Sequence, residues 1–133
     1  MTARRHSKRP VIVVGYDGSA ASSRAVDVAV ERARRMRGRL VIVHASDDAR
    51  RSKSLLEGLL LEGHDRLADL DYVTLVVPGS AAKAIAETAE TQAAAEVVVG
   101  TRGLGRARAL LGSTSRDLIS RTRCPVTVVP AGS

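Results

Sequence analysis

Five short apolar runs rich in β-branched residues alternate along this chain with longer segments of helical periodicity. The runs are Val11–Val14, Leu40–Val43, Tyr72–Val77, Val97–Val99 and Val126–Val129. Within these runs apolar and polar residues largely do not alternate, as is usual for strands covered on both faces. Repeated strand–helix–strand order predicts a parallel sheet with right-handed crossovers. We therefore expect a doubly wound α/β fold with helices on both faces of the sheet.

The first two helical segments differ in the strength of their signals. The first has an apolar stripe that reaches Met36, with Ser19 and Ser22 as cap candidates and Gly38 as its end. The second, Leu55–Ala68, is interrupted by Gly58 and Gly63. At its start, Ser54 and Glu57 form a capping-box pattern.

Two further helices are expected in the second half of the chain. The third runs from about Ala81 to Ala94 after the cap Ser80. The fourth follows Ser113, where Thr114 and Asp117 form a second capping-box pattern.

Length and composition favour one domain. The 133 residues suffice for one core, so we expect a domain over residues 11–133 after a disordered basic tail at residues 1–10. No run approaches the ~20 apolar residues of a membrane span, and the N-terminus has no apolar signal segment. These features predict a soluble, cytoplasmic protein. The single cysteine, Cys124, excludes an internal disulfide, and His6, His44 and His64 lack metal-ligand spacing.

The net charge of +7 raises the question of nucleic acid as a partner. Four of the basic residues lie in the tail MTARRHSKRP, and a run of this kind is usually a solvated arm. Proteins that bind single strands add stacking aromatic residues, whereas this chain has no Phe or Trp and two Tyr. Nucleic acid is therefore not the expected partner.

A glycine-rich basic loop, GTRGLGRARALLGSTS, follows the fourth apolar run. Gly100, Gly103 and Gly112 allow main-chain N–H groups to approach an anion, and the start of the next helix favours negative charge. The alternative is an ordinary surface loop with solvated arginines. The position favours a ligand site, because ligands of open α/β sheets bind at the carboxyl ends of the strands.

Three segments of the chain resemble the universal stress protein family in its small single-domain form. They are VIVVGYDGSAASSRAV, LVIVHA and GTRGLGRARALLGSTSRDLISRTRCPVTVV. The resemblance covers Val11–Pro130 and is weak from Asp47 to Leu70. It implies a Rossmann-like five-stranded sheet of order 3-2-1-4-5, in which Asp17 and Gly100 face each other across one crevice.

The resemblance also implies roles for residues at the strand ends. Asp17 matches the family aspartate near the ribose of bound ATP, and carboxylate oxygens accept hydrogen bonds from ribose hydroxyls. The alternative is that Asp17 only caps the following turn or helix. Ala45 matches the residue that lines the adenine. Three neighbours of the nucleotide are expected at Gly15, Tyr16 and Val99, and His44 is either a further neighbour or bonded locally.

The family pattern for ATP binding is Gly, two residues, Gly, nine residues, Gly, then Ser or Thr. Gly100 and Gly103 match its first part and Gly112 with Ser113 its last, but only the eight residues 104–111 lie between them. The loop is thus one residue shorter than the pattern. If phosphates bind, Ser113 and Thr114 would offer hydroxyl and amide groups, Arg102 would add charge, and Mg²⁺ would accompany ATP. These roles follow from the chemistry of phosphate oxygens.

Two functions remain open at this point. The first is an ATP-binding regulatory module of the stress response without efficient catalysis. The second is a nucleotide-free interaction domain whose shortened loop no longer holds phosphates. No P-loop, dinucleotide fingerprint or SGGxDS motif is present. Apart from Asp17 no catalytic base is evident, so slow ATP hydrolysis is the most that we expect.

The last apolar run, Val126–Val129, is short and would form an edge of the sheet. The resemblance implies a homodimer formed through this strand, because exposed edges tend to be covered or paired. The alternative is an edge blunted by Pro125 and Pro130.

Overall fold

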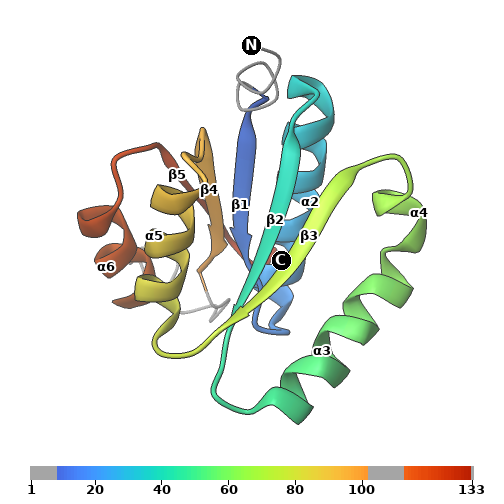
Figure 1. Ribbon diagram of the computed structural model, residues 1–133, viewed down its shortest axis with the longest axis horizontal. Helices are drawn as coiled ribbons and strands as arrows, with labels where there is room; N and C mark the ends of the chain where they lie inside the picture. Colours follow the sequence, from blue (N-terminus) through green and yellow to red (C-terminus); the bar gives the residue numbers. More distant parts are fainter. Residues whose placement is uncertain (1–8, 102–112, 133) are drawn as a thin grey trace.

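A parallel sheet of order β3-β2-β1-β4-β5 forms the centre of the molecule, which confirms the expected strand order. The computed structural model describes residues 9–101 and 113–132. Within them the strands are β1 (Val11–Gly15), β2 (Arg39–Ala45), β3 (Asp71–Val77), β4 (Glu96–Gly100) and β5 (Val126–Val129). The helices are α2 (Ala20–Met36), α3 (Ala49–Glu62), α4 (His64–Leu67), α5 (Ala81–Thr91) and α6 (Ser113–Arg121). Figure 1 shows this arrangement.

Strand β1 is paired on both sides, since Val13 lies opposite Val41 of β2 and Val97 of β4. Its residues Ile12, Val13 and Val14 are fully buried. Strands covered on both faces lose the alternation of apolar and polar side chains. This is the physical reason why the apolar runs of the sequence identify the central strands β1, β2 and β4, whereas the edge strands β3 and β5 are mostly half-buried.

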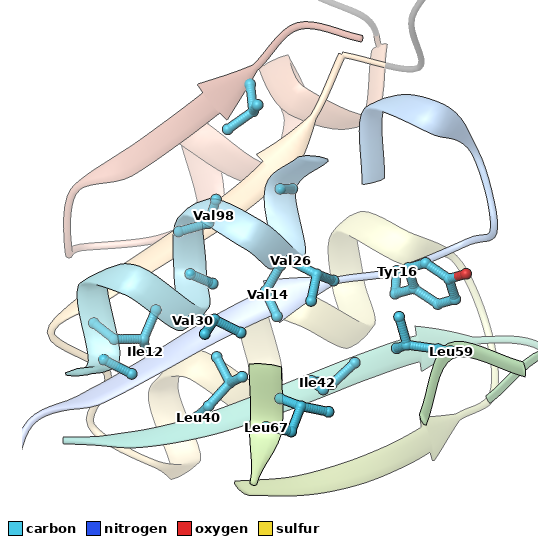
Figure 2. Close-up of a cluster of buried hydrophobic side chains, with 14 of the residues drawn as sticks. Ile12, Val14, Tyr16, Val26, Val30, Leu40, Ile42, Leu59, Leu67 and Val98 are labelled. Atoms are coloured by element: carbon cyan, nitrogen blue, oxygen red, sulfur yellow. The ribbon is translucent and has the colours of Figure 1, made fainter. Parts of the chain in front are cut away.

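Side chains of β1 alternate between two hydrophobic clusters, one on each face of the sheet. Ile12 and Val14 join a cluster with residues of α2, α3 and α4, which Figure 2 shows. Val13 joins the other cluster, with residues of α5 and α6. In Figure 1, α2 lies behind the strands, and α3 and α4 lie beyond the β3 edge.

The ends of α2 lie close to the expected residues. Ser19 is the N-cap, and its side chain accepts a hydrogen bond from the N–H of Ser22. At the other end the left-handed residue is Arg37 (φ 52°) rather than the expected Gly38. Gly38 is needed for another reason: a Cβ there would lie 2.3 Å from the carbonyl oxygen of Pro10.

The start of α3 differs from the sequence prediction. Asp48 is the N-cap and accepts from the N–H of Arg51 at 3.0 Å, so Ser54 and Glu57 lie inside the helix. The expected capping box is therefore wrong. Gly58 lies within α3, which ends at Glu62, and Gly63 separates it from the short α4, which begins at His64.

The two remaining helices begin near the predicted positions. Ser80 caps α5, as expected, by accepting from the N–H of Lys83. In α6 the carboxylate of Asp117 pairs with Arg121 at 2.9 Å. Asp117 thus serves an ion pair along the helix rather than the expected capping box.

A buried polar group lies at the start of β4, far along the strand from its carboxyl end. Glu96 is 6% exposed, accepts from the Thr127 hydroxyl at 2.5 Å and pairs with Arg32 of α2 at 3.3 Å. Buried carboxylates require such partners. The contacts tie α2 and β5 to the first residue of β4.

The part of the basic tail that the structure describes contacts the domain. Arg9 pairs with Asp71 at 3.0 Å, and the carbonyl oxygen of Pro10 accepts from the N–H of Arg39. In the described part of the chain, no helix has the length and apolar character needed to cross a membrane.

We predict that Gly58→Ala raises the free energy of unfolding by about 0.5–1 kcal/mol, because alanine favours a helix interior over glycine. A Cβ at Gly58 would have no atom within 4 Å. Urea denaturation measures the effect. Gly79→Ala is the matched control: its Cβ also meets open space, but φ is +100°, so this variant should lose stability. Equal effects of the two substitutions would contradict the prediction.

Candidate functional site

A cavity of about 250 Å³ lies at the carboxyl ends of β1, β2 and β4. The structure brings together here seven of the residues that the sequence predicted: Gly15, Tyr16, Asp17, Ala45, Val99, Gly100 and Thr114. It adds five that the sequence analysis did not assign to the site: Ser19, Ser22, Val43, Ala81 and Ile85. Arg102, Gly103 and Gly112 lie outside the described residues, and Ser113 is the first residue of α6.

Asp17 lies in the turn between β1 and α2, at the edge of the cavity. Its Oδ1 accepts from the N–H of Ser19 at 2.9 Å, and its own N–H donates to the Ser22 hydroxyl at 3.2 Å. The carboxylate thus supports the turn, as the alternative interpretation expected. It is also exposed and lines the cavity, so a structural role and a ligand role are compatible.

Tyr16 contributes its main chain to the site, because its side chain belongs to the cluster under α2. Figure 2 shows the ring next to Leu59, and the residue is 8% exposed. The N–H of Tyr16 donates to the carbonyl oxygen of Val43 at 2.9 Å. Its carbonyl oxygen lies 2.8 Å from Nδ1 of His44, so the histidine is bonded locally.

One side of the cavity is apolar. Val43 and Ala45 of β2, Val99 of β4 and Ile85 of α5 line it. Gly15 allows Ile85 to lie close to the end of β1, since a Cβ at this position would be 2.6 Å from Cδ1 of Ile85. Apolar walls with a few convergent polar groups are typical of small-molecule sites.

Three helices direct their N-terminal ends to the cavity, through Ser19 before α2, Ala81 of α5 and Thr114 of α6. Their first turns hold no acidic side chain. Free N–H groups and the helix dipole favour an anion at such ends. The sequence predicted this for α6 alone.

Gly100 has a packing role that the sequence analysis did not foresee. A Cβ at this position would lie 2.5 Å from the carbonyl carbon and 2.7 Å from the Cβ of Ala21. Main-chain atoms cannot yield easily, so the glycine lets the end of β4 lie directly against α2. The expected contact of Gly100 with phosphate remains a prediction.

A larger cavity, of about 610 Å³, lies between α3, α4 and β3. Leucines, Ala68, Tyr72 and Glu57 line it. Among the described residues that line it, Glu57 is the one charged residue and none begins a helix, so few groups there would orient a polar ligand.

Cys124 does not line the cavity but lies just before β5. Burial raises the pKa of its thiol, with a further contribution from the Glu96 carboxylate. A raised pKa lowers the thiolate fraction at neutral pH and hence the reactivity. Among residues 9–101 and 113–132, no three His, Cys, Asp or Glu side chains are grouped as a metal site.

The doubly wound sheet with a cavity at its strand-order reversal defines an α/β domain of the Rossmann-like class. The model of the universal stress protein family matches residues 8–130. A universal stress protein of Thermus aquaticus, named for the 3′ region of QAH/OAS sulfhydrylase, is 32% identical over an alignment of 137 positions, which covers 89% of this chain and 96% of that protein. The chain belongs to the universal stress protein family.

Two further comparisons extend this result. Among solved structures, a universal stress protein in complex with cAMP has 31% sequence identity and a TM-score of 0.74, covering 93% of this chain and 98% of that one. Universal stress protein Rv2623 of Mycobacterium tuberculosis is 31% identical over an alignment of 138 positions, which covers 92% of this chain and 46% of that protein. The chain therefore spans about half of the length of that relative.

We predict that Gly100→Ala lowers the free energy of unfolding by about 2 kcal/mol, because the added methyl group overpacks the contact with Ala21. Urea denaturation without ligand measures it. A role in phosphate binding alone would leave this value unchanged. Wild-type stability of the variant would show that β4 and α2 separate easily, contrary to the packing role.

Proposed function

We propose that this protein is a regulatory module of the stress response that binds an adenine nucleotide, ATP with Mg²⁺ in the first place, without efficient catalysis. One observation carries the proposal. A single cavity joins an apolar slot, the Asp17 carboxylate and three acid-free helix N-termini. These surroundings suit a base, a sugar and phosphate groups in turn.

The parts of the nucleotide can be assigned by chemistry. The adenine would lie against Ala45 and Val99, and the ribose hydroxyls would donate to Asp17. The phosphates would lie at the start of α6, where Thr114 would offer its hydroxyl and the first turn of the helix its N–H groups. Gly103, Gly112 and Arg102 are proposed to complete this end. The relative solved with cAMP supports an adenine nucleotide as the ligand.

Mg²⁺ would arrive with the nucleotide. It is usually held by phosphate oxygens, water and one or two carboxylates rather than by a cage of protein ligands. Asp17 and Thr114 provide hard oxygen donors at the cavity that fit this preference.

Efficient hydrolysis is not part of the proposal. Asp17 is the only carboxylate among the described residues that line the cavity, and it already accepts a hydrogen bond within its turn. Phosphoryl transfer needs further positioned charge and a group that orients the nucleophile.

A nucleotide-free interaction domain is the second candidate, and one observation favours it. The glycine loop has eight residues where the family pattern has nine. Titration of the protein with ATP and Mg²⁺, together with analysis of nucleotides released on denaturation, separates the two candidates. No released nucleotide and no binding heat at millimolar ATP would favour the interaction domain.

We further propose a homodimer through β5. The carbonyl oxygens of Pro125 and Val129 accept from N–H groups of β4 and the residue that follows it. Peptide groups alternate in direction along a strand, so the N–H and C=O of Val128 point away from β4. They are available to a second copy of the chain, which would cover the sheet edge.

We predict that Ala81→Leu weakens ATP binding at least about tenfold, because the larger side chain enters the slot at the start of α5. Isothermal titration calorimetry measures the affinity. Ala49→Leu is the matched control, since Ala49 is also the first residue of a helix but does not line the cavity. Equal affinities of the two variants would place the nucleotide elsewhere.

We predict that Val128→Pro turns the dimer into a monomer, because proline removes the outward N–H of β5. Sedimentation equilibrium measures the mass. Val76→Pro is the control. The carbonyl oxygen of Val77 accepts from the N–H of Ser46, the residue after β2, so the N–H of Val76 also points outward, but at the β3 edge. A dimer that persists in Val128→Pro, or dissociates in Val76→Pro, would contradict pairing through β5.

A further inference from the structure

His44 and the turn that carries Asp17 are joined by a buried hydrogen bond. His44 is 7% exposed, and its Nδ1 lies 2.8 Å from the carbonyl oxygen of Tyr16. A carbonyl oxygen only accepts, so Nδ1 carries the hydrogen and donates it. The bond crosses from β2 to the end of β1.

This bond acts on the peptide unit between Tyr16 and Asp17. That unit has two polar groups, the carbonyl of Tyr16 and the N–H of Asp17. The first accepts from His44, and the second donates to the Ser22 hydroxyl at 3.2 Å. With both groups bonded, the peptide plane is fixed, and so is the direction in which the Asp17 side chain leaves the main chain.

The direction matters because Asp17 lies between two cavities. One is the 250 Å³ cavity of the proposed nucleotide site. The other, of about 470 Å³, lies toward α3 and is lined by Asp17, His44 and Arg51 among others. The second cavity is also lined by Asp47 and Asp48, and Oδ1 of Asp17 already accepts from the N–H of Ser19 in the turn. The fixed peptide unit therefore holds the turn, and with it the carboxylate, at the edge of the first cavity.

We propose that His44 is a positioning residue that holds the Asp17 carboxylate toward the ribose hydroxyls of the bound nucleotide. The inference rests on the proposed function and narrows it. Ligands with a ribose diol gain from His44, and ligands without these hydroxyls do not. His44 itself does not touch the ligand.

The test compares His44→Asn with His44→Gln. The asparagine amide lies near the place of Nδ1 and can still donate to Tyr16, whereas the glutamine amide lies near the place of Nε2 and cannot. Calorimetry with Mg²⁺–ATP and with Mg²⁺–2′,3′-dideoxy-ATP gives affinities for a ligand with the diol and one without it.

We expect His44→Asn to bind ATP within about threefold of the wild type and His44→Gln to bind it about tenfold more weakly, the scale of a lost hydrogen bond to a charged group. All three proteins should bind dideoxy-ATP equally. A merely structural role of His44 would weaken both ligands together. Equal losses for both ligands in His44→Gln would therefore overturn the inference.

Asp17→Asn gives a second test that does not depend on whether the His44 variants fold. It keeps an Oδ1 acceptor for the N–H of Ser19 but loses the charge. The wild type should prefer ATP over dideoxy-ATP about tenfold, and Asp17→Asn should reduce this preference. If the wild type binds both ligands equally, the role of His44 is overturned but the proposed function is not. A wild type that binds neither overturns the proposed function as well.

Discussion

Main-chain hydrogen bonds join β1 to β2 on one side and to β4 on the other, and this double pairing determines the positions of the other elements. The chain that leaves β1 enters α2 on one face of the sheet, while the chain that leaves β4 leads to α6 on the other. The two connections diverge at the carboxyl edge, and the space between them is the cavity. The order of the strands thus places the cavity at this edge of the sheet.

The central strands could be predicted from the sequence because burial on both faces gives them uninterrupted apolar runs, as in Val11–Val14. The start of α3 could not. Asp48 and Ser54 are both good caps, and the choice depends on which residues of the helix meet the cluster around Leu56 and Leu59. This is a tertiary contact that no local pattern records.

The residues of the candidate site also fall into those that the sequence predicts and those that only tertiary contacts reveal. Residues at strand ends, such as Asp17 and Ala45, could be assigned because strand order alone places them together. Ala81 and Ile85 were missed, since an alanine and an isoleucine in an amphipathic helix carry no local signal of a site. Only the return path of the chain from β3 to β4 brings the start of α5 over β1 and β2. The packing of Gly100 on Ala21 was missed for a similar reason, because close approach is visible only in three dimensions.

Both ends of the glycine loop are anchored to the rest of the domain, so the length of the loop has little effect on the stability of the fold. Gly100 lies against α2, the N–H of Thr101 donates to Val129, and α6 is fixed through the buried Leu118. Between such fixed ends, one residue more or fewer changes the entropy of loop closure by only about 0.1 kcal/mol. The stability of the fold therefore tolerates a change of one residue in this segment. Under the proposed function, the length of the segment affects the contacts with the ligand more than it affects the scaffold.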